Sequence, residues 1–348
     1  MTDIRGSQKT IAMGLASTFG TPVALGTGKK IEVESYNDSE NTVELTANPI
    51  GGGVMMQTQS ERGQASPTVD IELLAGYNDA GVEAVAQFFG TAAVSSVVAG
   101  AFEHTFTMSE TFNAEWLTVA DQKTTEKTAE YPSCAVTSLS FSAETNDYLR
   151  LSMNLLANLQ DLDSSVNDVD QLADATVADT QRVVIRPENE FRINAQGGAA
   201  LAVGDIEDIV SADIVYNKPQ EHVAEVRGAA GNGEPESAEG IPIDATLTIV
   251  RKTQKDISFM EAHQAGTEYK ACFLNEGPIL TGSTKYAYEF YFPRLKLVEP
   301  VDAPANSPGR NAETITFRVL KATENPTGMT DTYPYIKIVN SREEKYEA

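Results

Sequence analysis

The side chains best suited to chemistry do not stand at the spacings that reactions require. The stretch Gly26-Thr-Gly-Lys-Lys30 has the glycines and lysines of a phosphate-binding loop, but Val23 occupies the place of the first glycine. Lys30 stands where a Ser or Thr would hold the metal ion. A strand pattern also follows, where a bound phosphate would need a helix N-terminus. The sequence therefore predicts no nucleotide site at this loop.

Two other stretches fail as ligand sites for similar reasons. Gly228-Ala-Ala-Gly-Asn-Gly233 has its glycines in the wrong order for a dinucleotide fingerprint and stands in a polar loop. The aspartates at 161–163 and 167–170 could offer oxygen ligands to a cation, but the glycine and the terminal glutamate of a calcium loop are missing. We therefore expect no cofactor and no bound metal.

Histidine and cysteine are too sparse for metal or nucleophilic catalysis. The three histidines, His104, His222 and His263, stand far from one another and from the two cysteines, and no Gly-x-Ser-x-Gly segment occurs. Cys134 and Cys272 are expected to be free, buried thiols in a reducing compartment. Hydrolysis by a pair of carboxylates stays open, because 50 acidic residues allow many pairs. No pair stands out, so we expect a protein that is not an enzyme.

The charge balance excludes a conventional nucleic-acid binder. The chain has 26 Lys and Arg against 50 Asp and Glu, a net charge of −24, which repels phosphate backbones. No apolar stretch approaches the roughly 20 residues that span a bilayer. The first residues also lack the apolar core of a secretory signal, so we expect synthesis to end in a cytoplasm, with no membrane partner.

The elements that must position the remaining side chains are short strands. Turn residues break up the apolar runs of this 348-residue chain, which favours a mainly β fold of about two domains. Strands that begin after Pro67 and Pro242 alternate apolar and polar residues, and each is followed by a helix that should end at a glycine, Gly90 or Gly266. These units are about half the chain apart, which indicates two copies of one plan.

Further elements repeat in the same order. Strand pairs are predicted at 134–141 with 148–156 and at 288–297 with 314–320, and the first strand of each pair aligns with the other without gaps. Long polar loops at about 38–66 and 218–241 each follow a strand that ends in Tyr-Asn. Loops of that length usually bind something, although plain disorder is the alternative.

These repeats predict the domain organisation. A first domain covers 1–160 and includes an N-terminal arm and the loop at 38–66. An acidic linker at 161–182 leads to a second domain at 183–323, followed by a C-terminal extension at 324–348.

The opening Ala16-Ser-Thr-Phe-Gly-Thr-Pro22, followed by a strand at 30–36, resembles the start of the tail tube proteins of long, non-contractile tailed bacteriophages, or siphoviruses. The resemblance continues through the long loop, the Asp-Ile-Glu-Leu-Leu strand, the helix ending at Gly90, the strand at 102–107 and the hairpin that begins near 131. It covers about 1–160 and returns more weakly over about 183–323.

The resemblance implies two tandem tail-tube-type β-sandwich domains, each with one flanking α-helix, whose strands join across subunits into a continuous inner β-barrel. It implies a structural virion protein (a major tail protein) that is assembled in the host cytoplasm and polymerises into stacked rings. These rings would form a negatively lined channel for DNA ejection. Three chains would form a pseudo-hexameric ring, and a true hexamer with an outward-facing second half is the alternative.

The implied partners are further copies of the chain, a tape measure protein, and tail terminator or distal tail proteins. Genomic DNA would pass through without specific binding. Alternative functions are the tube of a contractile injection device, or an extracellular β-sandwich surface protein.

Two sets of residues are candidates for the contacts of such a tube. Acidic residues that alternate with apolar ones on strands should face away from the core, toward a lumen. These lumen-facing candidates are Glu32, Glu34, Asp70, Glu72, Asp213 and Asp244. Glycines and methionines of the first long loop suit close packing on an irregular apolar surface. These inter-ring contact candidates are Pro49, Gly51, Gly52, Gly53, Met55 and Met56.

Overall fold

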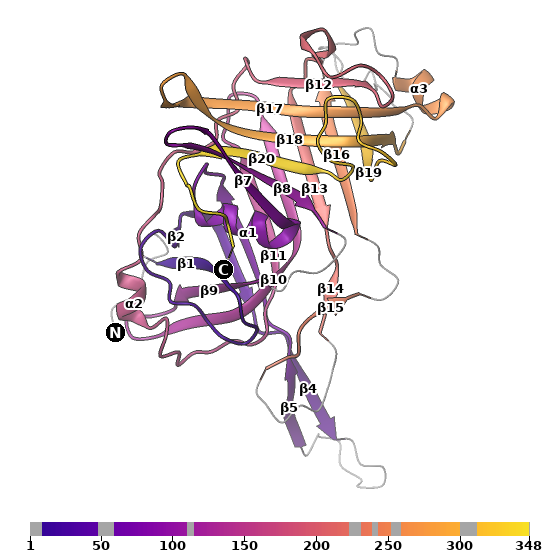
Figure 1. Ribbon diagram of the computed structural model, residues 1–348. Helices are drawn as coiled ribbons and strands as arrows, with labels where there is room; N and C mark the ends of the chain where they lie inside the picture. Colours follow the sequence, from indigo (N-terminus) through magenta and orange to yellow (C-terminus); the bar gives the residue numbers. More distant parts are fainter. Residues whose placement is uncertain are drawn as a thin grey trace.

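The computed structural model of this protein describes residues 9–47, 59–109, 115–222, 231–238, 243–251, 259–299 and 312–347. Over these residues the fold is mainly β, as predicted, and sixteen strands belong to one connected antiparallel sheet. Figure 1 shows the strands of the second half crossing one another in two layers above the N-terminal part. No described helix is long and apolar enough to cross a membrane.

The first half of the chain contains the strand–helix unit that the alternation predicts. Val69, Ile71 and Leu73 of one strand are buried, and the helix after it ends at Gly90, whose φ of 91° suits glycine. The repeated elements of this half are β1 (Ile11–Ala16), β3 (Val33–Ser39), β6 (Thr68–Leu74), α1 (Ala80–Phe89), β9 (Trp116–Gln122), β10 (Thr128–Glu144) and β11 (Arg150–Leu156).

The second half contains the same series. Ala245, Leu247 and Ile249 are buried in its strand, and its helix is followed by Gly266 with a φ of 67°. The repeated elements of this half are β12 (Glu190–Ala195), β13 (Ser211–Asn217), β16 (Asp244–Arg251), α3 (Phe259–Ala265), β17 (Glu268–Thr281), β18 (Thr284–Leu297) and β19 (Glu313–Leu320).

The two series pair in the same order. In the first half, β1 pairs with β9, β9 with β10, β10 with β11, β11 with β6, and β6 with β3. In the second, β12 pairs with β17, β17 with β18, β18 with β19, β19 with β16, and β16 with β13. The predicted hairpins β10–β11 and β18–β19 are therefore confirmed.

The two halves join through β10 and β13. These strands are antiparallel neighbours, with Ser138 opposite Asn217 and Glu144 opposite Ser211. One core cluster runs through both halves, and the rings of Phe141 and Phe290 meet at 4.9 Å between centroids. The division into two homologous domains stays a prediction.

The remaining strands and helices stand outside the repeat. The hairpin of β7 (Gly90–Val98) and β8 (Ala101–Met108) follows α1, and β20 (Tyr335–Asn340) lies between β8 and β18, so residues near the C-terminus are part of the main sheet. Both long loops contain a small hairpin, and Figure 1 shows both hairpins below the main body. These elements are β4 (Thr42–Ala47), β5 (Gln59–Ala65), β7 (Gly90–Val98), β8 (Ala101–Met108), α2 (Val169–Ala173), the 3-10 turn Val203–Asp205, β14 (Gln220–Glu221), β15 (Glu236–Ser237) and β20 (Tyr335–Asn340).

The acidic segment 161–182 packs against the first half. Asn167 is fully buried: its amide donates to the Val23 carbonyl at 2.9 Å, and its oxygen accepts from the Leu25 N–H at 2.7 Å. Leu172 of α2 joins a small apolar cluster with Leu25. This segment is therefore anchored by buried contacts at several points, although most of its aspartates are exposed.

The strand predicted over 30–36 is split in two. β2 (Lys30–Ile31) pairs with β1, whereas β3 pairs with β6, and Glu32 lies between them. The chain changes its pairing partner at Glu32, which a continuous alternating pattern does not reveal. The two cysteines are free and buried, as predicted, and burial raises the pKa of the Cys272 thiol to about 12.

Candidate functional site

The most extensive candidate site is one side of the sheet formed by β3, β6, β11, β10, β13, β16 and β19. On each of these strands from β6 to β19, alternate side chains are buried in the core and the others point away from it. We call the second set the polar face. It includes Asp70, Glu72, Asn154, Ser152, Ser138, Ser140, Ser142, Asn217, Asp213, Asp244, Thr246 and Thr248.

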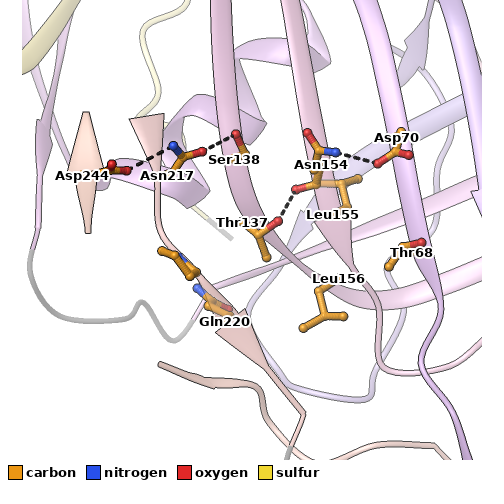
Figure 2. Close-up of a pocket in the computed structure, with 11 residues that line it drawn as sticks. Thr68, Asp70, Thr137, Ser138, Asn154, Leu155, Leu156, Asn217, Gln220 and Asp244 are labelled. Carbon is orange, nitrogen blue, oxygen red and sulfur yellow. Dashed lines mark hydrogen bonds between the residues drawn. The ribbon is translucent and has the colours of Figure 1, made fainter. Parts of the chain in front are cut away.

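One row of the polar face crosses both halves. Register places Asn37, Asp70, Asn154, Ser138, Asn217 and Asp244 side by side on six successive strands. Figure 2 shows the last five of these residues, which are joined in part by hydrogen bonds. The sequence pattern places each residue on the outer side of its strand, but only the pairing brings the row together.

In this row, asparagine amides donate to carboxylates, and a serine hydroxyl donates to an asparagine oxygen. The Asn154 amide donates to Asp70 at 2.8 Å, and the Asn217 amide donates to Asp244 at 3.1 Å. The Ser138 hydroxyl donates to the Asn217 oxygen at 2.8 Å. These three polar residues were not among the predicted site residues. The period-two alternation could have identified them, because it shows that a side chain faces outward whether it is a serine, an asparagine or an acid.

A shallow cavity of about 770 Å³ is lined by this row from Asp70 to Asp244, beside the places where the long loops join the sheet (Figure 2). Leu155 and Leu156 line it on β11, and Pro219 and Gln220 line it where the chain leaves β13. Across the described part of the chain, no group of His, Cys, Asp and Glu is arranged to hold a metal ion. The cavity is a surface hollow with polar and apolar lining residues, next to the loops.

The predicted lumen residues divide into those within the sheet and one beside it. Asp70, Glu72, Asp213 and Asp244 belong to the polar face, and the Ser142 hydroxyl donates to Asp213 at 2.6 Å.

The other two candidates pair with arginines. Glu34 on β3 binds Arg150 at 3.0 Å, so it reaches the polar face. Glu32 instead binds Arg182 at 2.7 Å, beside the buried Asp79 at the start of α1. Whether any of the six faces a channel stays a prediction. The inter-ring candidates at 49–56 lie outside the described residues.

The polar face is charged unevenly. Most of its acids lie on β3, β6, β13 and β16, with Arg150 among them on β11, whereas Arg318 on β19 and Lys296 on β18 lie opposite each other at the other end. The row of residues that begins with Lys296 and Arg318 runs across the sheet and ends with Glu72 and Ser35 at the open β3 edge. The sheet thus has an acidic end and a basic end.

Helix α1 packs against the buried side of this sheet, and buried polar groups hold it there. The Glu83 carboxylate accepts from Lys29 at 2.6 Å and from the Leu15 N–H at 3.2 Å. Lys218, at the end of β13, is buried and donates to the Phe88 carbonyl in the last turn of α1 at 3.4 Å. Burial lowers the pKa of Lys218 to about 8.

Comparison with known proteins gives one family. A family model described as "Phage tail tube protein" matches residues 6–318. Comparison with curated proteins gives no significant match.

Proposed function

Because the chain belongs to the phage tail tube proteins, and so has a structural role in the tail of the virion, we propose that its polar face lines the channel of a tube built from stacked rings. Three chains form each ring, and each contributes two copies of the tube fold. Phage DNA passes through this channel on its way to the host without specific binding.

The observation that carries this proposal is the junction between β10 and β13. It joins two sets of strands with the same pairing order into one continuous sheet with a buried face and a polar face. In the repeat, β18 corresponds to β10, and β3 corresponds to β13. The same junction between two chains would therefore pair β18 of one chain with β3 of the next. Repetition of the junction continues the sheet from chain to chain and covers the edge at β3.

The charges on the two strands of this junction suit the contact. Lys296 and Arg318 lie at the β18 end, and Glu34 and Glu72 lie at the β3 end. Opposite charges on the two surfaces favour the correct head-to-tail approach of two chains. This attraction helps to offset the mutual repulsion of chains that each have a net charge of −24.

The junction requires one local change in the structure. β17 lies beside β18 as far as the pairs Tyr269–Leu295 and Glu268–Lys296. In the first half, β10 pairs with β9 up to Cys134 and with β13 from Ser138 onward. The incoming β3 would therefore replace the last pairs of β17.

Three chains per ring follow from the repeat. Because the second half has its own polar face in the same sheet, both halves serve as wall, and six copies need only three chains. The acidic polar face would repel DNA phosphates over a screening length of roughly 8 Å at physiological salt, so DNA slides through. Assembly takes place in the host cytoplasm, with a tape measure protein and with terminator or distal tail proteins as the other partners.

The test is the mass of one ring. Purified full-length protein is polymerised, cross-linked within rings and dispersed, and the mass of the smallest closed species is measured. We expect three times the 37.5 kDa of one chain. A ring of six chains would overturn the trimer, and failure to form rings or tubes would overturn the assembly itself.

A further inference from the structure

Strand β7 is an edge strand without the usual protection. It ends the strand order of the main sheet, and β8 is its one ladder partner in the part of the chain that the structure describes. Its nine residues, Gly90–Val98, include no charged residue and no proline. Residues 95–98 are exposed, and the only irregularity is a bulge at the tip, after Ser96.

The other described edges of this sheet are short or charged. β2 has only two residues. β3 contains Glu34 and Asp38, and β12 contains Glu190 and Arg192, which form an ion pair. Short length and charge are the devices that natural sheets use against unwanted pairing. β7 is the long, uncharged exception.

The hydrogen bonds on both sides of β8 show which backbone groups of β7 point outward. The Ser109 N–H donates to the Phe89 carbonyl at 2.9 Å, and the Met108 N–H donates to the Pro334 carbonyl at 3.1 Å. Successive backbone groups in an antiparallel ladder alternate in direction. The N–H groups of Ala93 and Ser95 therefore point to β8, and those of Val94 and Ser96 point to the open edge.

Apolar residues are exposed at one end of this sheet, two of them on β7 itself. Val97 and Val98 at the tip of the β7–β8 hairpin are 46% and 43% exposed, and Ile279 near the tip of β17–β18 is 66% exposed. The register through β8, β20 and β18 places these residues at the same end of the sheet. Contact here would bury apolar surface in addition to satisfying the backbone groups.

We propose that the open edge of β7 pairs with an extended strand of a second copy of this chain. The charge of the protein favours this occupant: copies with a net charge of −24 repel one another, and at an uncharged strand two of them can meet without like charges on the paired edge. A different, basic partner would favour an acidic edge instead. The contact adds to the β18-to-β3 junction and rests on the proposed self-assembly.

Hydrogen exchange of single amides tests the pairing. Tubes made from purified protein alone are compared with dispersed subunits. In the tubes we expect the Val94 and Ser96 amides to exchange at least about tenfold more slowly, because each gains an acceptor, while the Ser95 amide is protected in both states. Equal exchange of Val94 and Ser96 in tubes and subunits would overturn the proposal.

Two proline variants provide a matched pair. Ser96→Pro removes an outward N–H from an exposed residue, so the subunit should keep its melting temperature while the critical concentration for polymerisation rises about tenfold. Ser95→Pro removes an N–H that faces β8, so it should instead weaken the hairpin and lower the melting temperature.

Each remaining outcome also decides the question. Normal tubes from Ser96→Pro would overturn the β7 contact and leave the tube function standing. Protection of Val94 and Ser96 in whole tails, but not in tubes of the purified chain, would assign the edge to another virion protein and overturn the second copy as occupant. A wild-type chain that never polymerises would overturn both proposals.

Discussion

The amide of Asn217 on β13 donates a hydrogen bond to the carboxylate of Asp244 on β16 at 3.1 Å. Asn37 and Asp70 occupy the corresponding register positions on β3 and β6. The two halves thus place an asparagine opposite an aspartate at the same point of their sheets. The row on the polar face repeats in chemistry as well as in topology.

Asn217→Asp should destabilise the protein in a pH-dependent way. It places a second carboxylate opposite Asp244, and like charges across strands cost up to about 1 kcal/mol. Urea unfolding should show this loss at pH 7 and its disappearance near pH 3, where carboxylates are protonated. Asn217→Ala is the control: it loses the hydrogen bond at every pH. A loss of stability for Asn217→Asp that does not change with pH would contradict the proposed repulsion between the two carboxylates.

Charge reversal on the polar face should slow DNA passage. Phages with Asp70→Lys, Glu72→Lys and Asp244→Lys should assemble tails at moderate salt, but their lumen should attract phosphate, which slows ejection most at low ionic strength. Ejection is followed by dye release from purified particles. The control places three lysines at the exposed residues 163, 170 and 174, which should leave the rate unchanged. Normal ejection by the first variant at low salt would remove these residues from the channel wall.

Deletion of residues 49–59 should separate folding from assembly. This segment contains the inter-ring contact candidates, and we expect it to pack on a neighbouring subunit or ring. The shortened protein should remain soluble with an unchanged far-ultraviolet circular dichroism spectrum, yet fail to polymerise in electron micrographs. Tubes of normal length would show that the loop is dispensable.

Lys218→Met should change how stability depends on pH. The folded-state pKa of about 8 lies below the ordinary 10.5, so the folded chain loses this proton first. The free energy of unfolding contributed by Lys218 therefore rises with pH from about 8 to 10.5. The stability difference between Lys218→Met and wild type should favour the variant at pH 7, by about 1–3 kcal/mol, and shrink over this window. A difference that stays constant from pH 7 to 10 would contradict the buried charge.

Arg251→Met should be among the most damaging single substitutions. Arg251 is fully buried and binds Glu207 at 2.8 Å and Glu313 at 2.7 Å. Its loss leaves two buried carboxylates without their cation, at a cost of about 3–5 kcal/mol in chemical denaturation. Adding Glu207→Gln and Glu313→Gln should restore part of the stability. A loss below about 1 kcal/mol for the single variant would show that water replaces the cation.

Local patterns determined much of this fold. The alternation in β6 and β16 identified the strands and their buried sides, because a strand directs successive side chains to opposite faces. Gly90 and Gly266 marked the ends of α1 and α3, because only glycine adopts a positive φ readily. The opening turn and the order of elements led to the correct family. Each of these signals depends on residues close together in the chain.

Only the tertiary structure decided which strands are neighbours. The pairing of β10 with β13 and the insertion of β20 beside β8 join segments far apart in the sequence. The change of pairing partner at Glu32 also depends on which strands lie beside it. A period of two shows which side chains share a face, but many pairings satisfy the same pattern. The choice among them depends on packing across the whole core. This is why Asp70, Asn154, Ser138, Asn217 and Asp244 were predictable as outward-facing residues and not as one row.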